Sequence, residues 1–301
     1  MRRTDPLYLL LFVLFGAGLI TGMFFDLEIS STLYSKDNTL AVIMSVIGLY
    51  LHYGSFVFFL GVLGKQLSLW APKRAFKILI LLIYSYLALS TSTYGAGALM
   101  SDSVCGFLYK GASHTISSYA VAGLYLFFPL FFLGAFINGK KCDRKVIKDL
   151  IILLSLMTVA LFFSWTVKSI FMRPRYRITL MGYEGIGFVP CFDIFREGKE
   201  LKSFFHLVSD DLASFYSGHA MNAVMGMVIM PCYAHIFSGL RGKEKTLSVL
   251  AVIISIPVML SRIVLGDHYL SDISTGALVG LLICTLYCGL NVKFISGKSQ
   301  N

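Results

Sequence analysis

Eight apolar runs, each long enough to cross a lipid bilayer, limit what this chain can fold into. A transmembrane helix needs roughly 20 apolar residues to cross a hydrocarbon layer about 30 Å thick. Hydrophobic residues make up 56% of the 301 residues and charged residues only 14%, which is more apolar surface than one soluble core can bury. The sequence therefore predicts an all-α, polytopic membrane helix bundle with about eight transmembrane helices and excludes a soluble globular fold. The runs cover about residues 6–25, 39–64, 78–100, 118–138, 150–172, 219–238, 246–265 and 272–291.

The basic residues lie in the gaps between these runs. The formal net charge is +10, but a nucleic-acid-binding protein gathers its cations on one face or segment, so no nucleic-acid partner is expected. Sixteen Lys and Arg residues lie at the chain ends and in the loops on the same side, and eight lie in the alternate loops. Because cytoplasmic loops carry the excess of Lys and Arg, both termini are expected in the cytoplasm. The first run is expected to stay as an anchor of a multi-pass protein of the cell inner (plasma) membrane.

Residues 173–218 form a long segment between two runs and are expected on the outer face. The segment is too polar to span the membrane and too apolar for a simple linker, so it is interpreted as a lid or substrate vestibule. A short amphipathic helix is expected around residues 198–208.

Cys105 and Cys191 both fall in loops expected outside, where a disulfide can form in an oxidising compartment, and the sequence leaves open whether they pair. No metal site is expected, because the six cysteines lack the ligand spacing of zinc sites.

The first polar cluster lies at the outer end of the fifth run, from Lys168 to Arg175. If the helix continues to its end, positions seven apart lie two turns apart on one face. Lys168 and Arg175 can therefore point at the same anion, and Arg173 and Arg177 can contribute. Taken alone, however, a basic cluster beside a span more commonly contacts lipid headgroups.

The second cluster, Ser217 to His219, lies where the long segment meets the sixth run. Free backbone N–H groups at a helix start and the positive end of the helix dipole form an anion site. Gly218 allows close approach, Ser217 can cap the helix or donate a hydrogen bond, and His219 can deliver a proton. Alone this motif is weak, because Ser is a common helix cap and interfacial histidines are ordinary.

The third cluster, residues 261–272, spans the tight turn between the last two runs. His268 and Asp272 are four apart, which puts a carboxylate beside an imidazole on the first turn of a helix. Such a carboxylate fixes the histidine tautomer and leaves the other ring nitrogen to attack. Arg262 can return to the same pocket, where it needs an anionic partner or a polar cavity, or it can extend to the headgroups. Asp267 is ambiguous, because a solvated turn residue has the same signature, and it is left outside the chemistry.

Together the three clusters resemble the signature of the type 2 phosphatidic acid phosphatase superfamily. That pattern runs Lys, six residues, Arg-Pro; then Pro-Ser-Gly-His; then Ser-Arg, five residues, His, three residues, Asp. In this chain it reads Lys168 with Arg175; Ser217, Gly218 and His219; then Ser261, Arg262, His268 and Asp272. The resemblance covers about residues 160–275. Tyr176 and Tyr216 stand where the family has prolines, which bears on backbone shape and headgroup fit more than on the chemistry.

The resemblance implies a six-helix phosphatase core over residues 76–301, including the external lid segment 173–218. Residues 1–75 would then form two additional N-terminal transmembrane helices, whose role the sequence does not indicate. The implied activity is metal-independent hydrolysis of the terminal phosphate of a lipid phosphate or diphosphate through a phosphohistidine intermediate, with no cofactor. The implied roles are His268 as nucleophile, Asp272 as the residue that holds its imidazole, His219 as acid, and Lys168, Arg175, Ser217, Gly218 and Arg262 as phosphate-binding residues.

The substrate is expected to be an amphiphile, because the site would lie where the spans meet the outer headgroup layer, facing the periplasm or the exterior. A glycerolipid phosphate, a polyprenyl diphosphate and a lipid A type phosphate all present the same terminal group, and the motifs do not separate them. The oligomeric state is open, and membrane lipids are the other expected partners.

The alternative function is a non-hydrolytic lipid transporter or scrambler, with Lys168 and Arg262 marking its path. Against it, the charged positions cluster at one membrane face. An inactive family member that binds phospholipid is a further alternative.

Overall fold

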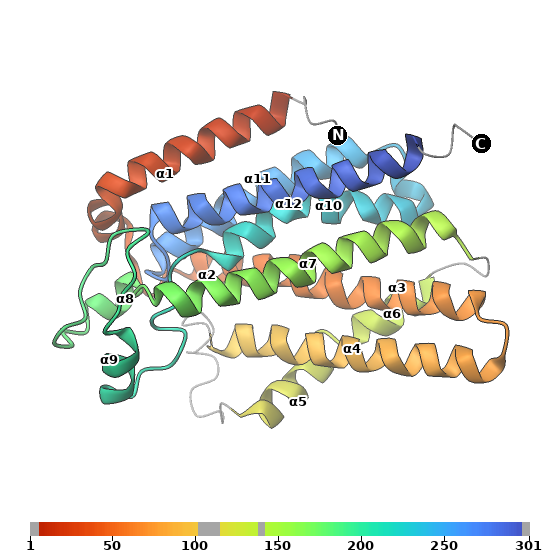
Figure 1. Cartoon of the computed structure of the whole chain (residues 1–301), viewed down its shortest axis with the longest axis horizontal. Coiled ribbons are helices and arrows are strands. Elements are labelled where there is room, and N and C mark those ends of the chain that lie inside the picture. Colours follow the sequence, from red (N-terminus) through yellow and green to blue (C-terminus); the bar gives the residue numbers. More distant parts are fainter. Residues whose placement is uncertain (1–5, 102–114, 138–141, 297–301) are drawn as a thin grey trace. The chain divides into compact units, whose positions relative to one another are not determined.

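Helices form the regular secondary structure of the computed structural model, which describes residues 6–101, 115–137 and 142–296. Within these ranges the chain contains no strand (Figure 1), and the predicted all-α class is confirmed. Cys105 lies outside the described residues, so whether it pairs with Cys191 stays open.

The N-terminal half follows the predicted apolar runs, with longer helix ends. The helix α2 continues through one π-helical turn, Tyr50–Gly54, directly into α3. The fourth predicted run consists of two helices, because Pro129 is tolerated in the first turn of a helix but not in its interior. The bounds are α1 Pro6–Leu33, α2 Thr39–Leu49, α3 Ser55–Trp70, α4 Arg74–Ser101, α5 Ile116–Leu126 and α6 Pro129–Ile137.

The C-terminal half contains the remaining predicted runs and the long segment between the fifth and sixth. Two short helices, α8 and α9, lie in that segment, and the helix expected around residues 198–208 is Gly198–Phe204. A 3₁₀ turn, Ser238–Leu240, follows α10. The bounds are α7 Arg144–Phe171, α8 Tyr176–Thr179, α9 Gly198–Phe204, α10 Gly218–Ile236, α11 Glu244–Val264 and α12 Leu270–Ser296.

Seven helical segments within the described ranges are long and apolar enough to cross a membrane. They correspond to seven of the eight predicted runs. The remaining predicted run, residues 219–238, is also helical and forms α10, but it is more polar, since it carries His219, Asn222 and His235. The chain is therefore a multi-pass membrane protein.

The chain forms two compact units. Within the described residues, the first unit contains the chain up to Gly48, Thr158–Met225 and Leu250–Gly289. The second contains Leu49–Met157, Gly226–Val249 and the chain from Leu290 on. All the predicted site residues belong to the first unit. The predicted division at residue 75, into two added helices and a six-helix core, stays a prediction.

In the second unit, α3 and α6 pack closely through two glycines. A Cβ added to Gly61 would lie 2.0 Å from the carbonyl oxygen of Phe131, and one added to Gly134 would lie 2.2 Å from that of Phe58. Small residues at such contacts let transmembrane helices approach to backbone distance.

In the first unit, backbone hydrogen bonds hold both ends of the segment 173–218. The Arg175 N–H donates to the carbonyl of Asp211, and the Ser214 N–H donates to that of Arg173, each at 3.0 Å. The Arg177 N–H donates to the carbonyl of Gly266, also at 3.0 Å. Gly266 has a φ of +67°, a conformation that favours glycine. These bonds bring the residues after α7, those before α10 and the turn between α11 and α12 to one place.

Candidate active site

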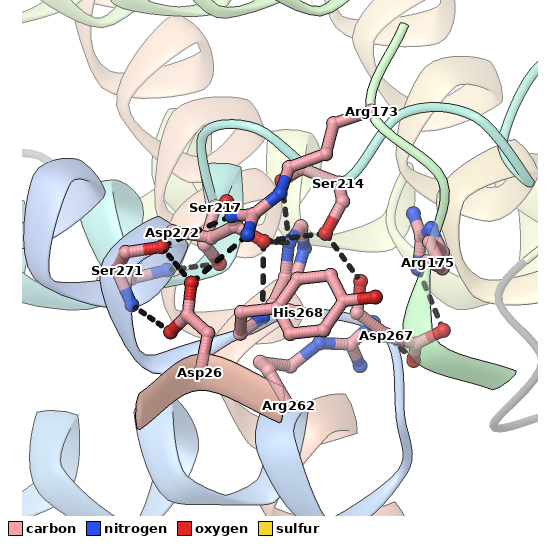
Figure 2. A network of polar contacts seen from close by, with 12 residues as sticks. Asp26, Arg173, Arg175, Ser214, Ser217, Arg262, Asp267, His268, Ser271 and Asp272 are labelled. Carbon is pink, nitrogen blue, oxygen red and sulfur yellow. Dashed lines mark hydrogen bonds and ion pairs between the residues drawn. The ribbon is translucent and has the colours of Figure 1, made fainter. Parts of the chain in front are cut away.

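The three predicted clusters meet in the first compact unit (Figure 2). The last turn of α11 supplies Arg262, the turn after α11 supplies Asp267 and His268, and the first turn of α12 supplies Asp272. The two ends of the long segment supply the arginines that follow α7 and the residues that begin α10. Polar side chains from stretches far apart in the sequence are thus in direct contact.

His268 is buried and its ring is held through one nitrogen. Its Nδ1 lies 2.6 Å from the carbonyl oxygen of Ser214, which can only accept, so Nδ1 carries the proton. Its Nε2 has no hydrogen-bond partner among the described residues. Burial lowers the pKa of His268 to about 4, a direction that Lys168 and Arg175 reinforce and Asp272 opposes. The imidazole is therefore neutral near pH 7, with the Nε2 lone pair available.

Asp272 lies beside this imidazole but does not make the short contact that the four-residue spacing suggests. Its Oδ2 is 3.8 Å from the His268 Nδ1. The carboxylate instead accepts hydrogen bonds from the Ser214 hydroxyl, from the Tyr269 N–H at 2.9 Å, and from Arg173 at 2.6 Å. The tautomer of His268 is thus set by the backbone of Ser214, and Asp272 acts on the ring as a nearby charge.

Arg262 and Asp267 form a completely buried ion pair. The Arg262 Nη2 lies 2.7 Å from the Asp267 Oδ2, and both side chains have 0% exposure. Arg262 also donates to the Ser45 hydroxyl in α2. The headgroup alternative for Arg262 is wrong, because an anionic partner holds the side chain in the protein.

Asp267 also joins the arginines of the first cluster, which corrects its interpretation as a solvated turn residue. Its Oδ1 lies 2.7 Å from the Arg175 Nη1 and 2.8 Å from the Arg177 Nε. Burial alone would raise its pKa, but Arg262, Arg175 and Arg177 hold the pKa of Asp267 well below its usual range. Asp267 is therefore the shared counter-ion that fixes three guanidinium groups.

Arg175 is held from two sides. Opposite Asp267, its Nε donates to the Asp210 carbonyl at 2.6 Å and its Nη2 pairs with the Asp210 carboxylate. Asp211 pairs with Arg177 at 3.2 Å. The two adjacent aspartates are thus partners of arginines.

Lys168 and His219 complete the cluster. Lys168, half-buried near the end of α7, interacts electrostatically with Arg175, Arg262 and Asp272. His219 interacts electrostatically with Arg262, His268 and Lys168, and its Nε2 lies 3.5 Å from the Ser45 hydroxyl. The basic and histidine residues of all three motifs are therefore in one group.

Ser217 caps α10. Its hydroxyl accepts from the Ala220 N–H at 3.3 Å, and its own N–H donates to the Asp272 carbonyl at 3.1 Å. Gly218 is the first residue of the helix, so the start of α10 lies directly against the first turn of α12. This is the geometry in which a helix N-terminus can meet an anion.

Sequence reasoning missed several members of this site. Arg173 was expected either to help bind the anion or to contact headgroups, yet it is 1% exposed and pairs with Asp272 and with Asp26 of α1. Asp26 lies just beyond the first predicted run and Ser45 lies in the second, and neither position belongs to one of the three motifs. Ser214 lies three residues before the second motif, and Ser271 lies inside the third.

Within the described ranges, no group of three or more His, Cys, Asp or Glu side chains could hold a metal ion. The aspartate side chains of the site pair with arginines instead.

The fold and the site define a multi-pass helical membrane protein with a buried histidine centre lined by arginine, lysine and aspartate side chains. Residues 149–295, just under half of the chain, match the model of the PAP2 superfamily. The predicted resemblance is confirmed, and the matched region contains every residue of the three motifs.

One curated relative is phosphatidylglycerophosphatase B of Bacillus subtilis (strain 168), which is 33% identical over 91 residues. The aligned stretch is 29% of this chain and 43% of the relative, so the chain spans less than half the length of the curated relative it matches. No solved structure matches the chain at a significant level.

Proposed function

We propose that this protein is an integral membrane phosphatase that removes the terminal phosphate of a lipid phosphate or diphosphate through a phosphohistidine intermediate. The observation that carries the proposal is the state of His268. Its Nδ1–H is fixed on the Ser214 carbonyl at 2.6 Å, its Nε2 is unpartnered among the described residues, and the imidazole interacts electrostatically with Lys168 and Arg175. A nucleophile needs such a free lone pair and a fixed orientation.

In the proposed first step, the Nε2 lone pair of His268 attacks the terminal phosphorus and the P–O bond to the leaving group breaks. The leaving oxygen takes a proton from His219. In the second step water attacks the phosphohistidine and gives a proton to His219. The P–N bond breaks, its electron pair returns to Nε2, and inorganic phosphate leaves.

Fixed hydrogen-bond donors and cations stabilise the negative charge on the transferred phosphoryl group. In phosphoryl transfer this stabilisation is the main contribution of the protein. Lys168, Arg175 and Arg262 provide the cations, and Ser217 with the Gly218 N–H provides the start of α10. The proposed reaction uses no metal, because these cations neutralise the phosphate oxygens. Asp210 has to release Arg175 before phosphate binds.

A glycerolipid phosphate is the substrate class that we favour. The relative's name, phosphatidylglycerophosphatase B, supports this choice, although only part of its length aligns with this chain. Exposed apolar side chains on the segment 173–218 also support an amphiphilic substrate: Phe192, Ile194, Phe204 and Val208. They would contact acyl chains while the headgroup enters the site.

We place the site on the outer, periplasmic face of the inner membrane, with both termini in the cytoplasm, because Lys and Arg are more frequent at the chain ends and in the loops on the same side as the ends. In a chain whose native cysteines are replaced, Ser209→Cys and Lys243→Cys test this orientation, since both positions are exposed. An impermeant thiol reagent added to intact cells should label only Ser209→Cys. Labelling of only Lys243→Cys would reverse the orientation.

The activity is tested by phosphate release from phosphatidylglycerophosphate and phosphatidic acid by the purified protein in the presence of EDTA. His268→Ala should lower kcat by at least about a thousandfold, the scale for loss of a nucleophile, and His219→Ala should also lower it strongly. His206→Asn is the matched control, because His206 is an exposed histidine whose positive φ asparagine tolerates. Equal release by wild type and His268→Ala would reject the enzyme and favour a lipid-binding or scrambling protein.

A further inference from the structure

The first helix, α1, packs closely against the first turns of α12 although it lies outside the region matched by the family model. Gly18, Gly22 and Asp26 are spaced four apart and share one face of α1. A Cβ on Gly18 would lie 2.7 Å from the Ser274 hydroxyl oxygen, and one on Gly22 would lie 2.4 Å from the Ser271 backbone nitrogen. These two glycines allow the approach that places Asp26 next to the site.

Asp26 is 2% exposed, and its contacts are all to site elements. Its Oδ1 accepts from the Ser271 N–H at 2.9 Å, and its Oδ2 accepts from the Ser271 hydroxyl and from the Arg173 Nη2 at 2.9 Å. Figure 2 shows the carboxylate of Asp26 facing Ser271 and Arg173. A carboxylate is buried at this depth only when its partners offset the loss of water.

Arg173 connects Asp26 to the residue beside the nucleophile. Its Nη1 lies 2.6 Å from the Asp272 Oδ1, and its Nε donates to the Val189 carbonyl at 2.7 Å. The guanidinium carbon lies 4.2 Å from the centre of the Tyr269 ring, within cation–π range. Arg173 is therefore buried among protein groups and bridges two carboxylates, so it is not available to the phosphate.

The charges in this chain of contacts do not cancel. One guanidinium is shared between Asp26 and Asp272, which leaves one net negative charge beside the imidazole of His268. As the Nε2 of His268 bonds to phosphorus, the ring becomes cationic, and a negative charge 3.8 Å from Nδ1 stabilises that state. Without Asp26, the charge of Arg173 would be paired only with that of Asp272 and would neutralise it. The cationic imidazole of His268 would then lose most of its stabilisation by Asp272.

We propose that Asp26 is a positioning residue for the reaction: by holding Arg173 and the start of α12, it keeps the charge of Asp272 available to His268. The inference rests on the proposed phosphatase function. It also gives the first helix a role: α1 lies outside residues 149–295 and supplies the carboxylate that pairs with Arg173.

The test compares Asp26→Asn with wild type and with Glu28→Gln, all as purified full-length protein assayed for phosphate release. Glu28 is the matched control, because it lies two residues further along α1 with its side chain exposed. Asp26→Asn should lower kcat about 10- to 100-fold, the size of one lost buried charge-assisted contact, and leave KM close to wild type. Glu28→Gln should leave both constants unchanged.

Comparing kcat with KM separates a positioning role from a general structural defect. A positioning role lowers kcat alone, whereas a structural defect changes both constants. If Asp26→Asn does not give folded protein, Asp26→Glu keeps the charge and displaces the carboxylate by one methylene, and it should also lower kcat at constant KM. A folded Asp26 variant with wild-type kcat would overturn the inference. An inactive wild-type protein would instead overturn the proposed function, so the two failures are distinguishable.

Discussion

Replacing Asp267 with Asn should unfold the first compact unit at a much lower temperature. The Asp267 carboxylate is fully buried and lies 2.7 Å from Arg262, 2.7 Å from Arg175 and 2.8 Å from Arg177. Asparagine keeps the shape of the side chain but removes the charge. Arg262, which has 0% exposure, would lose its ion pair with Asp267 and keep its hydrogen bond to the Ser45 hydroxyl.

The expected loss can be estimated from the burial of this group. Removing one partner of a buried ion pair costs about 3–5 kcal/mol, because the remaining charge stays buried without compensation. For a protein of this size such a loss lowers the unfolding temperature by on the order of 10 °C. An exposed ion pair would contribute only about 0–1 kcal/mol. The change in unfolding temperature therefore distinguishes a buried ion pair of Asp267 from an exposed one.

The assay is thermal unfolding of the purified protein in detergent, with Asp37→Asn as the control for an exposed aspartate. Because the folded-state pKa of Asp267 is depressed, its contribution to stability is fully present above the unfolded-state pKa and is lost as pH falls through the folded-state value. The gap between wild type and Asp267→Asn should therefore be equal at pH 7 and pH 5 and narrow only below about pH 4. Unfolding of Asp267→Asn at the same temperature as Asp37→Asn would refute the reasoning.

Two further predictions concern the nucleophile and the first helix. The Lys168 cation lowers the pKa of His268, so Lys168→Met should raise that pKa and move the acid limb of kcat/KM to higher pH. Both proteins are assayed on the same substrate, whose own titration cancels in the comparison, and an unmoved limb would contradict the assignment. Gly22→Ala should lower kcat and the unfolding temperature, because the new methyl group would lie 2.4 Å from the Ser271 nitrogen. Gly16→Ala, at a position with no atom within 4 Å, is its control, and equal behaviour of the two variants would argue against close packing of α1 at the site.

The fold class could be predicted because the membrane leaves few choices for an apolar run of this length. The break at Pro129 and the π-helical turn at Tyr50–Gly54 could not, since hydropathy does not report local helix geometry. The start of α10 was predictable from Ser217, which caps the helix.

The members of the site were predictable where a spacing defines a shared helix turn, as for His268 and Asp272. The contacts among them were not, because they depend on which element packs nearby. Ser214 holds the His268 ring through a backbone carbonyl, which any residue type could supply. Asp26 lies just beyond the predicted end of the first run, where a carboxylate commonly faces water. Only its position inside a longer helix reveals that it is buried, and a carboxylate within a span is itself a functional signal.

The central claim is that His268 carries the phosphoryl group during turnover, and direct trapping of that intermediate tests it best. The purified protein is mixed with phosphatidylglycerophosphate, quenched in alkali within the first turnover, and digested for mass spectrometry. The account predicts one added phosphoryl group on the peptide that contains His268, absent from His268→Ala. Full wild-type turnover with that peptide unmodified at every quench time, or with the group on another residue, would contradict it.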